Sequence, residues 1–221
     1  GGNVNLKHGV FTNNNDDSVD WDEGYQGNLQ YIIVKQGASK GEAFEMDTEG
    51  SSDGFLSKPT LSNVTVLAEK VADRADYSLN FKKRSGGFFH NTVVTVSPDS
   101  ETSLSTCVNV DGSGSQALVG EALVLNNWIQ DCASGSGDQG TLANVSGLDN
   151  GTINAVAAQL DNNFASQAPE AVLSSAIDWD AVNSAFSESV ADASYLDATS
   201  YIGAVNPDGS DVWWAGWTVA G

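Results

Sequence analysis

Residues 61–65 are LSNVT, and four other segments of the chain repeat this arrangement. Each has an apolar residue, any residue, a polar or aromatic residue, and then a run rich in residues that favour strands. The other copies are LKHGV (6–10), LQYII (29–33), FHNTV (89–93) and LNNWI (125–129), and the five follow one another at spacings of 23, 32, 28 and 36 residues. Repetition of this kind predicts stacked structural units.

A second pattern lies between these copies. Its members are VDWD (19–22), FEMD (44–47), LNFK (79–82) and VNVD (108–111), at spacings of 25, 35 and 29 residues. Apolar residues alternate with polar ones, as in strands that are buried on one side only.

Two interleaved strand types with a shared period predict a right-handed parallel β-helix, an all-β solenoid whose coils stack strand on strand. We expect it to cover residues 1–150. The rival fold is a β-sandwich, but its hairpins would usually have two-residue turns and no fixed columns of like residues. The column of His8, Tyr31, Asn63, Asn91 and Asn127 is expected to mark a turn in each coil.

The charge of the chain is strongly unbalanced. The formal net charge is −20, and all nine Lys and Arg residues lie at or before Arg84. Such a surface repels phosphate backbones, so we expect no nucleic-acid partner. No run of apolar residues is long enough for a transmembrane segment.

Residues 151–221 form a different region, rich in alanine and serine, which we expect to contain short helices and loops. It ends in a turn and three tryptophans, Trp213, Trp214 and Trp217. A solenoid needs cover for its open end, which favours a Trp-rich cap that also packs on the flank. The alternative is an aromatic ligand-binding platform for sugars made by the same three residues.

The two cysteines, Cys107 and Cys132, are predicted to form a disulfide that closes a loop of about 26 residues, worth roughly 3 to 4 kcal/mol. An even pair of cysteines fits an exported protein, whereas two buried free thiols would fit the cytosol. The chain begins with Gly1-Gly2 and has Met46 as its only methionine, so we interpret it as a mature form or an excised piece.

Three segments together resemble a known family: residues 1–36, the PTLSNVTV run at 59–66, and ATSYIGAVNPDGSDVWWAGWT near the end. They are similar to exported bacterial right-handed parallel β-helix proteins of poorly defined function, often labelled lipoproteins. The resemblance implies an extracellular or outer cell-surface location and carries no catalytic residues. Such proteins usually have further coils before GGNVNLKH, so we expect the Gly1 end to be covered by a missing N-terminal segment, a partner or self-association.

The stretch DDSVDWDEG (16–24) holds five carboxylates and is the first candidate site. The second strand pattern would stack Asp20 over Glu45 and Asp22 over Asp47. Two charges about 4 Å apart repel by roughly 4 kcal/mol at an effective dielectric near 20, so such a patch tends to hold a cation, share a proton or spread into water. Calcium suits flexible oxygen ligands and is the candidate ion here; the sequence leaves this open beside the other interpretation, a solvated acidic edge.

The same acidic face could instead serve a carbohydrate-active enzyme, a polysaccharide lyase or a glycosidase. A lyase would also need a base, and Lys82 falls in the column of Asp22 and Asp47. The histidines, His8 and His90, are interpreted as structural, because no metal-binding spacing joins them.

From the sequence we therefore predict a non-enzymatic, exported surface protein that binds a ligand, glycan or protein partner, with calcium as its cofactor. The first alternative is the carbohydrate-active enzyme. The second is a structural fibre protein that self-associates end to end through exposed coils.

Overall fold

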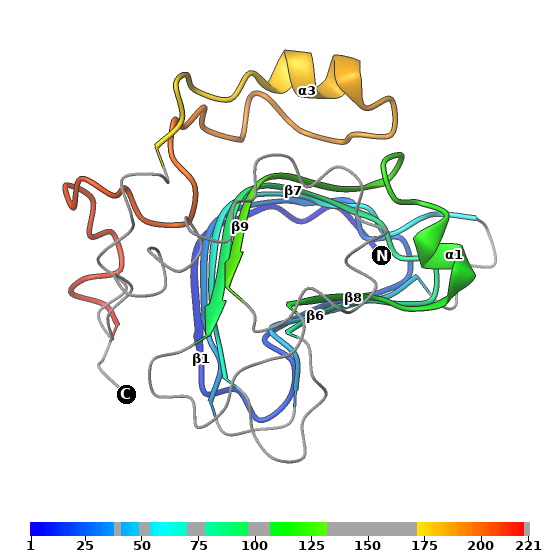
Figure 1. Cartoon of the computed structure of the whole chain (residues 1–221), viewed down its shortest axis with the longest axis horizontal. Coiled ribbons are helices and arrows are strands. Elements are labelled where there is room, and N and C mark those ends of the chain that lie inside the picture. Colours follow the sequence, from blue (N-terminus) through cyan, green and yellow to red (C-terminus); the bar gives the residue numbers. More distant parts are fainter. Residues whose placement is uncertain (38–40, 49–53, 70–77, 97–106, 132–171, 219–221) are drawn as a thin grey trace.

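The strands of the two sequence patterns form two parallel sheets. The computed structural model describes residues 1–37, 41–48, 54–69, 78–96, 107–131 and 172–218. The long sheet has the order β1-β3-β5-β7-β9 and the short sheet the order β2-β4-β6-β8. Seen end-on, the strands of each sheet lie behind one another and enclose a common interior (Figure 1).

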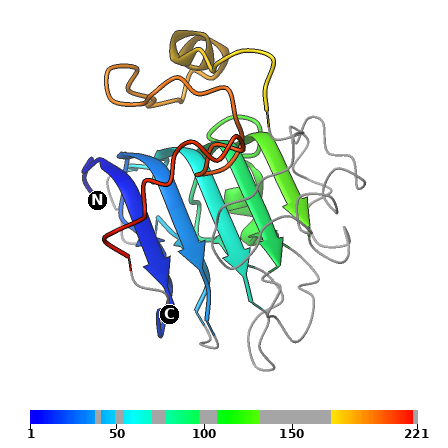
Figure 2. The same ribbon diagram turned by 90° about the vertical axis from the view of Figure 1, so that its left-hand side faces the viewer.

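The long sheet consists of β1 (Leu6–Thr12), β3 (Asn28–Lys35), β5 (Thr60–Ala68), β7 (Gly87–Val96) and β9 (Leu123–Asp131). Leu6 pairs with Leu29, Leu29 with Leu61, Leu61 with Phe89, and Phe89 with Leu125. This register is the column predicted from the sequence. The five strands lie side by side in chain order (Figure 2).

The short sheet consists of β2 (Val19–Trp21), β4 (Phe44–Met46), β6 (Leu79–Phe81) and β8 (Val108–Val110). Its register joins Val19, Phe44, Leu79 and Val108, again as the sequence predicts. The short helix α1 (Gly112–Gln116) follows β8. Each long strand thus pairs with the next long strand along the chain, and each short strand with the next short one.

Every long strand bends at the same column. His8, Tyr31, Asn63, Asn91 and Asn127 all have positive φ, between 51° and 62°. Asparagine tolerates this left-handed backbone better than most residues, because its short polar side chain can hydrogen-bond locally. The prediction of a turn column is confirmed, and the bend lets one strand line two walls of the interior.

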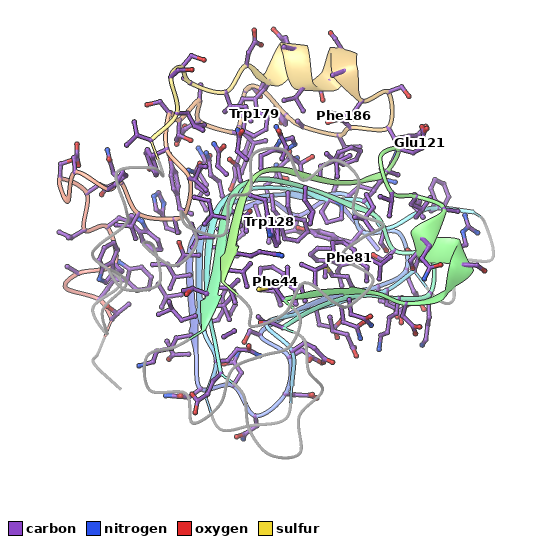
Figure 3. The ribbon with its side chains drawn as sticks, viewed as in Figure 1. Phe44, Phe81, Glu121, Trp128, Trp179 and Phe186 are labelled. Atoms are coloured by element: carbon purple, nitrogen blue, oxygen red, sulfur yellow. The ribbon has the colours of Figure 1, made fainter. Side chains whose placement is uncertain are left out.

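The interior between the sheets is a packed aromatic core. Phe89 meets Phe44, Phe81 and Trp128 edge-on, with ring centroids 5.6, 5.8 and 5.9 Å apart. Edge-to-face contacts of this kind add about 0.5–1.5 kcal/mol to the burial of the rings. Figure 3 shows Phe44, Phe81 and Trp128 pointing into this interior.

The described part of the C-terminal region, residues 172–218, lies along the outer face of the long sheet (Figures 1 and 2). It contains α3 (Trp179–Ala185), whose N-cap Asp178 accepts a hydrogen bond from the backbone N–H of Ala181. Trp179 packs edge-on against His90 of β7, and Phe186 packs against Phe88. The central long strands β3, β5 and β7 are therefore buried on both faces, whereas β1 at the edge of the sheet stays partly exposed.

Asn63 is the hub of this contact. Its side-chain nitrogen donates to the backbone oxygens of Tyr201 and Gly203, at 3.1 and 3.0 Å. Its side-chain oxygen accepts from the Thr199 hydroxyl at 2.8 Å and from the Gln30 amide at 3.1 Å. The asparagines of the bend thus bond mainly to the C-terminal segment and to one another, rather than to the backbone of their own turns.

Candidate functional site: an acidic face on the short sheet

The acidic stretch of the sequence lies on the outer face of the short sheet. In β2 and β4, Trp21 and Met46 are buried in the core while Asp20 and Glu45 point outward. Asp20 pairs directly with Glu45, as predicted. The same column continues as Asn80 and Asn109, so the carboxylates occupy only the first two coils.

Asp22 and Asp47 form the next column. The Asp47 N–H donates to the Trp21 oxygen at 3.0 Å, which continues the parallel pairing of β2 and β4. Asp22 is exposed, whereas Asp47 is 6% exposed and pairs with Lys83 at 3.1 Å. Burial raises the pKa of Asp22, and the neighbouring Asp47 carboxylate raises it further.

Lysine side chains neutralise part of this face. The Lys82 ammonium donates to the Glu45 carboxylate and forms an ion pair with it. Although burial disfavours its charged form, the bond to Glu45 raises the pKa of Lys82. Lys82 therefore stays protonated, which makes it a poor proton acceptor for a lyase reaction.

The closest group of carboxylates includes two residues outside the predicted metal set: Asp17, which lies in the DDSVDWDEG stretch, and Glu42, which the sequence analysis missed. One oxygen each from Asp17, Glu42 and Glu45 lies within 4.8 Å of the others, and all three residues are partly buried. The Glu42 N–H also donates to the Asp17 carboxylate, which holds the two segments together. A signal existed: Asp17 and Glu42 are 25 residues apart, as are Asp20 and Glu45, so both pairs follow the same repeat.

Crowding of these negative charges changes their protonation. Burial, a hydrogen bond with Asp17 and the nearby charges raise the pKa of Glu42 to about 7. Burial and the neighbouring Glu45 and Asp17 carboxylates likewise raise the pKa of Asp20. The face is thus short of positive charge and retains a proton near neutral pH.

The four residues predicted to bind metal are only partly brought together. Glu45 belongs to the three-carboxylate group, Asp20 lies beside it, and Asp22 and Asp47 form a neighbouring pair. All of these ligands are oxygens, which fit a hard cation such as calcium better than zinc or copper.

The tryptophans of the predicted platform differ in exposure. Trp214 is buried against Ile33, Ala204 and Val205, so it supports the packing of the C-terminal segment. Trp213 is partly buried and Trp217 is 56% exposed. Only these last two could contact a ligand.

Cys107 is fully buried in the core at the start of β8. Cys132 lies outside the described residues, so the disulfide stays a prediction. Among the described residues, no helix is long and apolar enough to cross a membrane.

The fold and this face can be compared with known proteins. The family model of the pectate-lyase-like β-helix domain matches residues 1–218, nearly the whole chain. The chain therefore belongs to this parallel β-helix family. No individual curated protein and no solved structure gives a significant match.

Proposed function

We propose that this chain is an exported, non-enzymatic protein with a closed right-handed solenoid, which binds a glycan through the acidic face of its short sheet with the help of calcium. One observation carries the proposal: the oxygens of Asp17, Glu42 and Glu45 gather within 4.8 Å. The family relationship supports a carbohydrate ligand, since the family is described by its likeness to pectate lyase.

Electrostatics supports calcium at this place. Three carboxylates this close repel one another, and Lys82 offsets the charge of one of them. A divalent cation would replace the proton that Glu42 otherwise holds, and would relieve the repulsion. Calcium takes six to eight oxygens, so three protein ligands leave positions for water or for ligand oxygens.

A cation would also explain how so acidic a chain could bind an acidic glycan. With a net charge of −20, the protein repels uronic acids over the range of the Debye length. Calcium between the carboxylates of the protein and those of the sugar would remove this repulsion locally. We therefore favour a uronic-acid polymer as the ligand of this face.

The calcium site is tested by thermal melting with added calcium and with chelator. We expect calcium to raise the melting temperature of the wild type, because it binds the folded state only. The double variant Asp17→Asn, Glu42→Gln should abolish this rise. Glu121→Gln is the control, since it also removes negative charge, at a residue that is exposed beyond α1 (Figure 3).

A further variant separates the predicted ligand set from the observed cluster. Asp22→Asn should leave the calcium effect intact if the ion lies at Asp17, Glu42 and Glu45. Loss of the effect in this variant alone would move the ion to Asp22 and Asp47. A melting temperature that does not respond to calcium in the wild type would refute the site.

Glycan binding is tested by affinity electrophoresis in gels that contain polygalacturonate or alginate. Retardation should need calcium and should disappear in the Asp17→Asn, Glu42→Gln variant. Equal mobility in gels with and without polymer, with calcium present, would contradict the proposed function.

A second candidate function, a carbohydrate-active enzyme, is favoured by one observation. Burial and the neighbouring Asp17 and Glu45 raise the pKa of Glu42 to about 7, which is the arrangement of a general acid with an ionised partner. The spacing of at most 4.8 Å is close to the roughly 5 Å of a retaining glycosidase. Release of reducing ends from polysaccharides, abolished by Glu42→Gln, would support hydrolysis over binding alone.

The Gly1 end supplies the last part of the proposal. β1 lies at the edge of the long sheet, and Val4 and Leu6 before and within it are exposed. An edge strand with apolar neighbours is a surface for strand addition, which supports a partner or self-association there. Light scattering that shows a monomer at all concentrations would exclude self-association and fibres.

A further inference from the structure

A row of aromatic rings runs across the outer flank of the long sheet, away from the acidic face. His8 stacks on Tyr31, with ring centroids 4.8 Å apart and planes 13° apart. His8 also touches Trp213 at 5.1 Å, and Trp213 stacks with Trp217 at 6.1 Å and 28°. The row joins the bend of the first two coils to the end of the C-terminal segment.

The outer ring of this row is held in place although it is exposed. The indole N–H of Trp217 donates to the Trp213 oxygen at 2.8 Å, and that of Trp213 donates to the Ala204 oxygen at 2.9 Å. Trp214, which is 8% exposed, holds the same turn against the sheet. Trp217 nevertheless leaves 56% of its surface in solvent. A ring that is already oriented loses little conformational entropy when a ligand stacks on it.

The surroundings of the row are polar and negative. Asp208 and Asp211 are exposed on the preceding turn, and Asp208 accepts a hydrogen bond from the Ser210 N–H. Burial raises the pKa of Tyr201 to about 12, and the charges of Asp211, Asp197 and Asp208 raise it too, which places these carboxylates near Tyr201. Tyr201 in turn contacts Tyr31, so the carboxylates lie beside the row.

The exposed tryptophan ring and the carboxylates beside it together indicate which kind of ligand would bind. An exposed indole offers an apolar face, and carboxylates accept hydrogen bonds from hydroxyl groups. The C-terminal segment contains no lysine or arginine, and the nearby Lys7 is already paired with Asp197 of that segment at 2.9 Å. Little positive charge is therefore left to balance an anion. A neutral sugar ring has an apolar C–H face and a rim of hydroxyl donors, and it meets both requirements.

We propose that Trp217 and Trp213, together with His8, form a second glycan site that stacks a neutral sugar ring without calcium. This inference rests on the proposed glycan-binding function but uses another face and another class of sugar. It also reduces the predicted platform of three tryptophans to two, because Trp214 is buried in the packing of the C-terminal segment and does not reach a ligand.

Affinity electrophoresis in chelator tests the site, with galactomannan, xylan and mixed-linkage β-glucan as separate probes. We expect wild type to be retarded by at least one of these neutral polymers. Trp217→Ala should weaken the apparent affinity roughly tenfold, the loss expected for an aromatic anchor. His8→Ala should weaken the apparent affinity less, because His8 contacts Trp213 and not the exposed Trp217.

Phe55→Ala is the matched control, since Phe55 is another exposed aromatic residue, 65% exposed, and packs beside Gly24 on a different part of the chain. Its retardation and melting temperature should equal those of the wild type. An unchanged melting temperature of Trp217→Ala would show that the variant is folded.

Three outcomes would overturn the site: no retardation by any neutral polymer, equal retardation of wild type and Trp217→Ala, or a change of oligomeric mass in Trp217→Ala. The last would make the patch a contact between copies of the chain. The two sites fail separately, because binding of polygalacturonate with calcium should persist in Trp217→Ala and vanish in the Asp17→Asn, Glu42→Gln variant.

Discussion

Replacement of Asn63 tests how the C-terminal segment is attached to the sheet. Asn63 is fully buried, has a φ of 54°, and bonds to Tyr201, Gly203 and Thr199 of the segment. The Asn63→Ala variant removes all of these hydrogen bonds and puts alanine in a left-handed backbone. We expect it to be among the most destabilising single changes on the outer face of the long sheet.

The magnitude follows from the groups that lose their partner. Two backbone oxygens, those of Tyr201 and Gly203, lose the donor that Asn63 supplies, at about 1–3 kcal/mol each when buried. The left-handed conformation costs alanine a further 1 kcal/mol or so relative to asparagine. The free energy of unfolding should therefore fall by about 3–7 kcal/mol, a large share of a typical 5–15 kcal/mol.

Urea denaturation followed by circular dichroism measures this loss. Asn63→Gly separates the two causes, because glycine accepts positive φ freely and should recover about 1 kcal/mol of it. Asn109→Ala is the control: Asn109 lies on the short sheet and donates one side-chain bond, to Asn80 at 3.0 Å, and should cost about 1 kcal/mol or less. A loss below 1 kcal/mol in Asn63→Ala would refute the stabilising role of the Asn63 hydrogen bonds to the C-terminal segment. Equal losses in the alanine and glycine variants would refute the contribution of the left-handed backbone.

Three further outcomes can be measured. Burial lowers the pKa of His90 to about 4 from an ordinary 6.5, so between these pH values the imidazole is protonated in the unfolded chain but neutral in the folded one. The free energy of unfolding should fall by about 3 kcal/mol as the pH drops from 6.5 to 4, and urea denaturation at several pH values measures this fall. The fall should be smaller in His90→Gln. The same pH dependence in this variant as in wild type would contradict the assignment to His90. Titration of Glu42 has the opposite effect on stability, because burial and neighbouring charges raise its pKa in the folded state to about 7 from the ordinary 4.5. The free energy of unfolding should therefore fall as the pH rises from 4.5 through 7. Glu42→Gln should reduce this dependence on pH. Titration of thiols in denaturant without reductant should find none if Cys107 and Cys132 are paired, and two free thiols would refute the disulfide.

The stacked columns could be predicted from the sequence because parallel pairing in register is a local rule. Each coil must place an apolar side chain over the one before, so Leu6, Leu29 and Leu61 recur in the same position of the repeat. The bend was predictable for the same reason, since asparagine tolerates positive φ and recurs at Asn63, Asn91 and Asn127. The stacking of Asp20 over Glu45 followed from the same alignment.

The partners of those acids were not predictable in full. Lys82 belongs to the column of Asp22 and Asp47 by alignment, yet its flexible side chain reaches Glu45. Asp17 and Glu42 keep the 25-residue spacing of Asp20 and Glu45, but they lie before the strands, outside the alternating pattern that defined the alignment. Side-chain reach and loop path decide such contacts, and neither follows from the repeat.

The sequence alone thus determined the strands, their register and the placing of carboxylates on one outer face, because parallel pairing in register makes each residue's neighbours the equivalent residues of the adjacent repeats. Only the tertiary structure decided what covers the other face. The segment 172–218 buries His90 and Asn63 through contacts that span up to 140 residues, and no periodic pattern links partners so far apart. The same docking decides that Trp214 is buried while Trp217 is left exposed.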